Sequence, residues 1–209
     1  MLSPVNSKHR RGHFPELKVV LAGEIGNAER TIPVVWSHAQ VMEHDADLIR
    51  EAARVLDADA IVSAAEAIAD SGETFFCGVG SSSGFASLCV LRFSGIGVRA
   101  TNTDEPLTQR LHAGVLRPGD VCVAISHTGE SAETIAAIQA ARSSGARTVA
   151  VTSFAGSPVT THADVVLVCT SRPAPATREG LFANPIALLS VLGALHAEVA
   201  TRIQTPSHE

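Results

Sequence analysis

The chain has 209 residues, 45% of them hydrophobic, and its formal net charge is −5 at pH 7. This length and apolar content are enough to bury one sizeable core, so we expect one domain with an appendage. The negative net charge excludes a general polyanion binder, and the short basic run over residues 8–13 is more typical of a solvated terminus than of a nucleic-acid contact.

Four cysteines occur without any Cys-x-x-Cys spacing, and three of them fall in apolar, strand-like runs. Thiols in such runs pack as small hydrophobic groups, so we expect neither a disulfide nor a metal site. The polar, basic N-terminus has no apolar core behind it, which argues against a secretory signal and favours a cytoplasmic protein. The longest apolar stretch, near the C-terminus, is interrupted by polar residues and proline. We expect it to be too short to span a bilayer, and we expect no membrane partner.

The first 36 residues differ in character from the rest. Residues 14–22 carry apolar positions at helical spacing, which predicts a short amphipathic helix too small to be stable alone. Residues 23–35, with Gly26 and Pro33, are typical of a linker. Two helices are predicted to follow, one with a capping-box pattern at Ser37 and one capped by Asp57.

From residue 74 onward, apolar runs of strand length alternate with helical segments. Strands are predicted over residues 75–79, 97–101, 120–125, 147–152 and 165–169, and helices over 83–93, 130–144 and 181–201. Continuously apolar strands separated by helices indicate a parallel sheet covered on both faces. The predicted fold class is therefore α/β, a three-layer α-β-α sandwich with a mainly five-stranded parallel sheet and additional N-terminal helices.

A hydroxyl-rich turn follows the predicted strand 120–125 and leads into a helix. Ser126, Thr128, Ser131 and Thr134 offer hydroxyl groups, and Gly129 lets the backbone approach a ligand closely. The next helix points its free N–H groups and positive dipole end into this turn, which is the arrangement of an anion site. Because the turn contains no Lys or Arg, it suits reversible binding of a small phosphorylated metabolite rather than phosphoryl transfer.

A matching turn follows the predicted strand 75–79. Gly80, Ser81, Ser82 and Ser83 connect this strand to the next helix. Ligands of parallel sheets bind at the carboxyl ends of the strands, where both turns fall, so we expect the two turns to hold one phosphate monoester from two sides. The simpler alternative is that the Ser and Thr residues only cap the helices, for which one residue per helix is enough.

A dinucleotide-binding fingerprint is a further alternative for the first turn, because residues 78–84 read Gly-Val-Gly-Ser-Ser-Ser-Gly, with Asp104 as a candidate ribose acid. The third glycine is one position late, and Asp104 lies further along the chain than this motif requires. The fingerprint also leaves the second turn unexplained. We therefore expect no cofactor.

The motifs of residues 38–200 together resemble the sugar isomerase (SIS) domain family. The resemblance is carried by Gly78-x-Gly80-Ser81-Ser82, by Leu116-x-Pro118-Gly119-Asp120 and by Ser126-x-Thr128-Gly129-x-Ser131-x-Glu133. The usual second motif of the family is Ser-x-Ser-Gly-x-Thr-x-Glu, so the hydroxyl groups are kept at 128 and 131.

This resemblance implies a flavodoxin-like SIS fold that binds the phosphate of a sugar phosphate. The residues it assigns to the phosphate are Ser81, Ser82, Ser126, His127 (chiefly through its backbone), Thr128 and Ser131. Further contacts are expected from Gly80, Ser83, Gly129, Thr134 and Glu179.

The N-terminus is similar, over residues 12–21, to the closing helix of the helix-turn-helix domain of RpiR-type transcriptional regulators. In that family the domain precedes an SIS domain that senses a sugar phosphate. The resemblance implies a remnant of this domain with a linker at 1–36, an SIS domain at 37–209, and a homodimer or higher homo-oligomer. DNA binding is expected only through a helix-turn-helix domain that is largely missing here.

The expected function is that of a sugar-phosphate-sensing effector domain, and the alternative is an SIS-type aldose–ketose isomerase. An isomerase needs a base beside the carbonyl group, for which the candidates are Glu179, His112, His127 and His196. Some SIS isomerases carry a catalytic acid in a Leu-Phe-Glu run, but the similar run at 181–183 reads Leu-Phe-Ala. No catalytic residue is therefore assigned.

Overall fold

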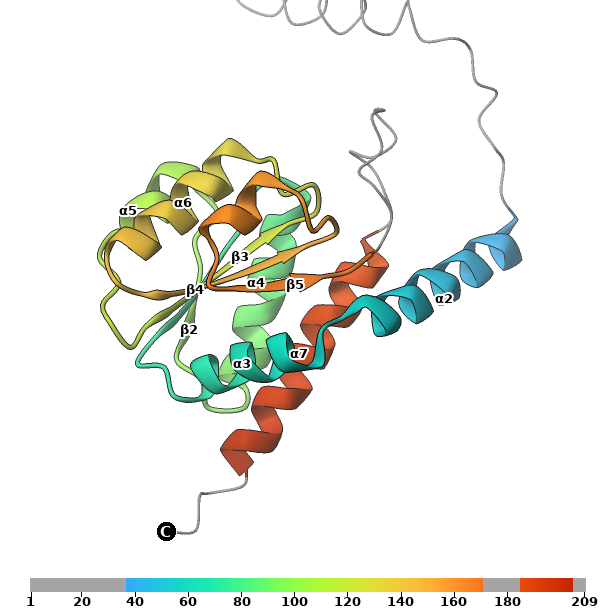
Figure 1. Cartoon of the computed structure of the whole chain (residues 1–209), viewed down its shortest axis with the longest axis horizontal. Coiled ribbons are helices and arrows are strands. Elements are labelled where there is room, and N and C mark those ends of the chain that lie inside the picture. Colours follow the sequence, from blue (N-terminus) through green and yellow to red (C-terminus); the bar gives the residue numbers. More distant parts are fainter. Residues whose placement is uncertain (1–36, 171–184, 205–209) are drawn as a thin grey trace, which may run out of the picture. The chain divides into compact units, whose positions relative to one another are not determined.

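The computed structural model describes residues 37–170 and 185–204 (Figure 1). The chain divides into two compact units, Met1–Ser37 and His38–Glu209, and the described residues belong almost entirely to the second unit. The short helix predicted at 14–22, Glu179 and the start of the helix predicted at 181–201 lie outside the described residues. The assignment of residues 1–36 to a helix-turn-helix remnant stays a prediction.

Five parallel strands form one sheet in the order β2-β1-β3-β4-β5 (Figure 1). The strands are β1 (Thr74–Cys77), β2 (Ala100–Thr101), β3 (Val121–Ser126), β4 (Arg147–Thr152) and β5 (Val165–Val168). Strands β1 and β3 are buried along their whole length, because helices cover both faces of the sheet. The five-stranded parallel sheet expected from the sequence is confirmed.

Helices form a layer on each face of this sheet. They are α2 (His38–Val55), α3 (Ala58–Ala69), α4 (Ser81–Ser94), α5 (Pro106–Ala113), α6 (Ala132–Ser143) and α7 (Ile186–Gln204), with a 3-10 helix η1 (Pro158–His162). In Figure 1, α5 and α6 lie on one face of the sheet, whereas α3, α4 and α7 lie on the other. The predicted three-layer sandwich is therefore confirmed.

Side chains of β1 alternate between two separate hydrophobic cores. Phe76 belongs to the core on the side of α3, α4 and α7, where its ring centroid lies 5.0 Å from that of Phe93. Its neighbours Phe75 and Cys77 belong to the opposite core, together with Ile138 of α6. Full burial of one such large apolar side chain contributes about 1.5–3 kcal/mol. The two cores hold the sheet between its helix layers and so fix the positions of the strand ends.

Two elements differ from the sequence-based expectation. The strand predicted over 97–101 is reduced to its last two residues, because Gly97 adopts a φ of 97° ahead of them. Helix α5 is absent from the prediction, since eight residues are too few for a clear apolar period. Its start is nevertheless well defined: the Glu105 carboxylate accepts hydrogen bonds from the N–H groups of Leu107 and Thr108.

Helix α7 is long and apolar enough to cross a membrane by length and composition alone. By length and composition, the expectation that the C-terminal apolar stretch is too short to span a bilayer is wrong. The structure gives the apolar residues another role, because Leu188, Leu192 and Leu195 are buried in the core shared with α3 and α4. Such burial is typical of the core helix of a globular domain.

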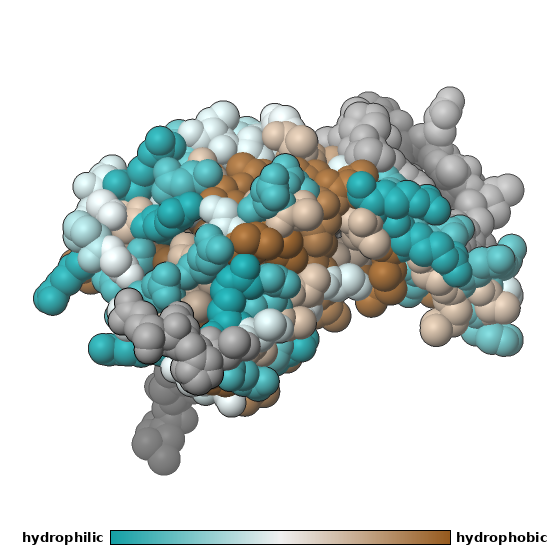
Figure 2. Space-filling view, turned by 60° about the horizontal axis from the view of Figure 1, so that its bottom comes forward, coloured by the Kyte–Doolittle hydropathy of each residue, from teal (hydrophilic) through white to brown (hydrophobic). Residues whose placement is uncertain are grey.

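Helix α2 leaves apolar side chains exposed to solvent. Ala52 is its one buried residue, whereas Val41 is 40% exposed, Met42 is 68% exposed and Ile49 is 40% exposed. Figure 2 also shows hydrophobic residues gathered in the middle of one face of the molecule. Clustered apolar surface on a globular domain marks a place of contact with another molecule.

The four cysteines are free thiols, all of them buried. Burial raises the pKa of Cys89 and of Cys169 to about 12. The Cys122 pKa is also raised, by its hydrogen bond with Cys77 at 3.8 Å between sulfurs and by burial.

We therefore predict that the folded protein does not react with the thiol reagent DTNB at neutral pH, because thiolate formation is disfavoured and the sulfurs are inaccessible. The absorbance of the released thiolate measures the reaction, and the protein in denaturant, where every thiol is accessible, is the control. Stoichiometric labelling of any cysteine before unfolding would contradict this prediction.

Candidate functional site

The two hydroxyl-rich turns follow neighbouring strands. Strand β1 runs through Gly78 and Gly80 into α4, and β3 runs into the turn before α6. Since Cys77 pairs with Ala124, the next residue, Gly78, lies beside Ile125. A Cβ atom added to Gly78 would lie 2.7 Å from the Ile125 carbonyl oxygen and 3.0 Å from Cβ of Ser82. The first turn, the start of α4 and the end of β3 are thus in direct contact.

The helices that start at these turns lack side-chain caps. Asp57 accepts hydrogen bonds from the first N–H groups of α3, and Glu105 does so for α5. By contrast, the N-cap residues of α4 and α6, Gly80 and Ser131, make no side-chain cap hydrogen bond. The interpretation that Ser131 merely caps α6 is therefore not supported. The Ser82 and Ser83 N–H groups at the start of α4 donate to the Val79 and Gly80 carbonyl oxygens, so it is chiefly the start of α6 that keeps N–H groups available for an anion.

The second turn is held in shape by its own hydroxyl groups. Ser126 Oγ accepts a hydrogen bond from the Gly129 N–H at 3.0 Å, and Thr128 Oγ1 accepts one from the Glu130 N–H at 3.3 Å. The Ser126 and Ser131 hydroxyl oxygens are 3.5 Å apart. In that contact one hydroxyl donates to the other, so the O–H of the accepting serine remains a donor for a ligand oxygen.

The His127 ring is directed toward the end of β4. Its Nδ1 lies 2.7 Å from Ser153 Oγ, and its carbonyl oxygen accepts hydrogen bonds from the Ser153 N–H and from Thr152 Oγ1. The ring also packs edge-on against Phe154, with centroids 5.7 Å apart. Burial lowers the pKa of His127. Its Nε2 is buried without a hydrogen-bond partner in the described part of the chain.

The first turn differs in how its serines are used. Ser82 is buried directly after the turn, and its N–H donates to the Val79 carbonyl oxygen. Ser83 Oγ donates to the Gly80 carbonyl oxygen at 2.9 Å, so this hydroxyl stabilises the turn itself. Gly80 has a φ of 61° and a ψ of −128°, a conformation that is open only to glycine. Ser81, at the first position of α4, is exposed.

Thr134 is fully buried in the first turn of α6, and its Oγ1 has no hydrogen-bond partner among the residues that the structure describes. It thus faces the interior rather than the surface of the turn. Glu179, the remaining expected contact, lies outside the described residues.

Two candidate bases from the sequence have structural roles instead. His112 Nε2 lies 2.8 Å from the Glu73 carboxylate, and its ring stacks on Phe75 with centroids 4.4 Å apart. Glu73 directly precedes β1, so this pair lies at the amino edge of the sheet, opposite the two turns. His196 of α7 lies 3.3 Å from the Arg92 guanidinium and binds the Arg92 carbonyl oxygen, which fastens α7 to α4.

A third polar turn, after β4, was not among the expected site residues. Thr152, Ser153 and Ser157 are buried there, and Ser157 Oγ donates to the Phe154 carbonyl oxygen. The signal in the sequence is that β4 ends in Thr152 and is followed by Ser153, as β3 ends in Ser126. Gln109, which contacts the first turn, carries no such signal because it belongs to the helix that the sequence pattern does not reveal.

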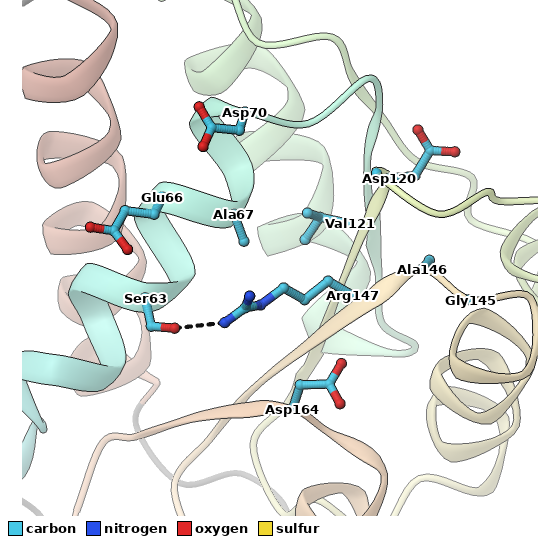
Figure 3. Close-up of a pocket in the computed structure, with 11 residues that line it drawn as sticks. Ser63, Glu66, Ala67, Asp70, Asp120, Val121, Gly145, Ala146, Arg147 and Asp164 are labelled. Atoms are coloured by element: carbon cyan, nitrogen blue, oxygen red, sulfur yellow. Dashed lines mark hydrogen bonds between the residues drawn. The ribbon is translucent and has the colours of Figure 1, made fainter. Parts of the chain in front are cut away.

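A hollow of about 540 Å³ lies at the opposite, amino edge of the sheet (Figure 3). Its lining includes four carboxylates, from Glu66, Asp70, Asp120 and Asp164. The one guanidinium group among them, that of Arg147, donates a hydrogen bond to Ser63 Oγ at 2.8 Å. This excess of negative charge repels a phosphate dianion, so the hollow is a poor anion site.

The five-stranded parallel sheet between two helix layers, with two hydroxyl-rich turns at its carboxyl edge, defines an α/β sandwich domain. Residues 67–197 match the family model described as the SIS domain, which covers more than half of the chain. The chain therefore belongs to the SIS family.

Several of its relatives are helix-turn-helix (HTH) transcriptional regulators. The chain is 31% identical over 197 residues to an uncharacterized HTH-type transcriptional regulator of Caldanaerobacter subterraneus, a match that covers 90% of this chain and 70% of the relative. It is 27% identical to RpiR of Escherichia coli, over 79% of this chain and 54% of RpiR. It is 28% identical to HexR of the same species, over 74% of this chain and 56% of HexR. The chain thus spans about half the length of RpiR and HexR.

Solved structures show the same fold. The sugar isomerase domain of an RpiR transcription factor from Sphaerobacter thermophilus is 28% identical, with a TM-score of 0.70 over 79% of this chain and 90% of that one. The Vibrio vulnificus NanR protein, solved in complex with ManNAc-6P, is 21% identical, with a TM-score of 0.73 over 89% of this chain and 68% of that one. The second likeness concerns the fold alone.

Replacing Gly129 by Ala is predicted to destabilise the protein by at least about 2 kcal/mol, because of backbone strain and overpacking. Gly129 has a φ of 70°, and an added Cβ would lie 2.1 Å from Ser157 Oγ. Urea unfolding measures the change. Gly156→Ala is the matched control, since nothing lies within 4 Å of an added Cβ there and its φ is not positive. Equal stability of the two variants would show that the turn is not tightly packed.

The lowered pKa of His127 predicts a loss of stability in mild acid. Below the ordinary His pKa of 6.5, the unfolded chain takes up a proton more readily than the folded chain, so the free energy of unfolding falls as pH falls. Above this pH the imidazole is neutral in both states and the effect vanishes. His127→Asn, which keeps an amide for Ser153, is expected to lose less stability between neutral and mildly acidic pH. Parallel pH profiles of unfolding for the two proteins would refute this.

Proposed function

We propose that this domain binds a phosphorylated sugar between its two hydroxyl-rich turns and serves as the effector domain of an RpiR-type transcriptional regulator. The observation that carries the proposal is the pair of uncapped helix starts, α4 and α6, at the ends of adjacent parallel strands. The N–H groups at the start of α6, together with the hydroxyl groups of both turns, would match the several oxygens of a phosphate monoester.

Hydroxyl groups would complete the phosphate site. Ser82, Thr128 and Ser131 stand at the two turns, and one O–H of the Ser126–Ser131 pair would be left to donate to the ligand. Neither turn contains Lys or Arg, so helix dipoles and N–H groups would balance the phosphate charge. Such a site favours reversible binding over phosphoryl transfer, for which a metal and a positioned Lys are needed.

Sensing is favoured over isomerase catalysis. His112 and His196 are engaged in structural contacts away from the turns, and His127 Nδ1 is engaged with Ser153. Glu130 and Glu133, at the start of α6, are exposed to solvent. The names of the relatives agree with a regulatory role, and the ManNAc-6P bound by NanR supports a sugar phosphate as the class of ligand.

Regulation would follow from differential binding. A sugar phosphate held between α4 and α6 would favour one arrangement of a homodimer, or higher homo-oligomer, and thereby bias attached DNA-binding domains. The exposed apolar residues of α2 offer a surface for such an assembly. We place this function in the cytoplasm, where regulators meet both DNA and phosphorylated metabolites.

Ser131→Ala is predicted to weaken sugar-phosphate binding roughly tenfold, the loss of one hydrogen bond to a charged group. Stability should change little, since Ser131 makes no cap hydrogen bond. A thermal-shift screen of hexose, pentose and amino-sugar phosphates, ManNAc-6P included, identifies ligands, and calorimetry measures their affinities. Ser143→Ala, at the exposed far end of α6, is the matched control, and the unphosphorylated sugars are the ligand control.

The screen also separates a sensor from an isomerase. A sensor raises its melting temperature with a sugar phosphate, and NMR of the mixture shows no product. Formation of the corresponding ketose or aldose phosphate would favour the isomerase hypothesis over the sensor hypothesis. If no sugar phosphate changed the melting temperature, both hypotheses would be rejected.

A further inference from the structure

Gln109 of α5 is a fully buried polar side chain that contacts the first turn. Its Nε2 donates hydrogen bonds to the carbonyl oxygen of Gly78 at 2.9 Å and to that of Thr103 at 2.7 Å. Its Oε1 is buried without a hydrogen-bond partner among the described residues. A buried amide with an unpaired acceptor is a poor packing element. Gln109 therefore contributes to the structure through the two hydrogen bonds that its Nε2 donates.

The Gln109 side-chain amide donates a hydrogen bond that a neighbouring strand would otherwise donate to the backbone. Strand β2 pairs only with Thr74 and Phe75, so the edge of β1 is open beyond them on this side. The carbonyl group of Gly78, just past the end of β1, has no strand there to supply a donor. The side-chain amide of Gln109 supplies it, and at the same time ties Gly78 to Thr103 in the connection between β2 and α5.

This bond also sets the direction of the next N–H group. In β1, the Thr74 N–H faces the β2 side, where it donates to the Arg99 carbonyl oxygen. Backbone groups alternate with a period of two, so the Gly78 carbonyl group faces the same side, where Gln109 lies. The peptide bond between Gly78 and Val79 is trans, so the Val79 N–H points the opposite way, toward the end of β3 and the second turn.

We propose that Gln109 is a positioning residue for the phosphate site: it holds the Gly78–Val79 peptide so that the Val79 N–H stays directed at the anion between the two turns. This inference depends on the proposed function, because it takes the phosphate group as the ligand of the turns. A donor that is already held in place needs no reorganisation when the anion arrives, whereas an unrestrained peptide group rotates.

The test compares Gln109→Met and Gln109→Glu with Thr148→Val in the full chain. Methionine keeps the volume and removes both donors. Glutamate places a carboxylate against two carbonyl oxygens at neutral pH and donates to one of them once it is protonated. Thr148 is the matched control, because it is equally buried and its hydroxyl also bonds two groups, the Asp164 carboxylate and the His162 carbonyl oxygen, at the amino end of β4.

Calorimetry with inorganic phosphate and with ManNAc-6P measures the effect on binding. Gln109→Met is expected to bind the probes roughly tenfold more weakly, and Thr148→Val as tightly as the unchanged chain. Gln109→Glu is expected to regain affinity, relative to the unchanged chain, as the pH is lowered from about 8 to about 5.5. Unchanged affinity of Gln109→Met, or equal weakening by Thr148→Val, would overturn the proposal.

Hydrogen exchange of the free protein tests the same role without a ligand. In Gln109→Met, the amides of residues 78–82 are expected to exchange faster while those at the amino end of β4 are unchanged. A uniform rise in exchange across the domain would show a merely structural role. If the unchanged chain binds neither probe, the calorimetry uses the sugar phosphate that the thermal-shift screen identifies. If no sugar phosphate binds, the proposed function fails, and the exchange data alone decide whether Gln109 holds the first turn. If Gln109→Met does not fold, the same measurements are made on Gln109→Glu at a pH where its carboxyl group is protonated and at a pH where it is ionised.

Discussion

The candidate site depends on the parallel pairing of β1 with β3. This pairing sets Cys77 beside Ala124, so the two strands end side by side and each continues into a helix. Parallel strands bring their carboxyl ends to one edge, and the following helices direct their first N–H groups back toward it. A slip of one residue would exchange the side chains of β1 between the two cores and is resisted by the two phenylalanines packed on opposite sides.

The helix starts of this domain fall into two kinds. Those of α3 and α5 are closed by carboxylates, from Asp57 and Glu105, which repel a second anion. Those of α4 and α6 have no side-chain cap. The turn before α4 is fastened by Ser82 and Ser83 of that helix, and the turn before α6 by its own hydroxyl groups and by β4. Ser126 holds Gly129, and His127 is tied to β4. A helix start without a side-chain cap, on a turn that is already held in place, can bind an anion without the cost of ordering the turn.

The two edges of the sheet have different electrostatic character. The carboxyl edge offers N–H and hydroxyl donors without acidic side chains in the turn interiors, whereas the amino edge carries four carboxylates around one arginine. The half-buried contact of Glu73 with His112 Nε2 also belongs to the amino edge, where it lies at the start of β1. In the proposed function an anionic ligand would therefore bind at the carboxyl edge, because the carboxylates of the amino edge repel it.

Local patterns in the sequence were enough to predict the five strands, the parallel sheet, the helix layers and the hydroxyl-rich turns, because continuous apolar runs and turn residues report directly on burial and chain reversal. They could not reveal α5, whose eight residues have no clear period, nor the direction of the His127 ring, nor the contact of Gln109 with Gly78. Each of these depends on which segments become neighbours. That choice is made by packing and register across the folded sheet, through contacts between residues far apart in the chain.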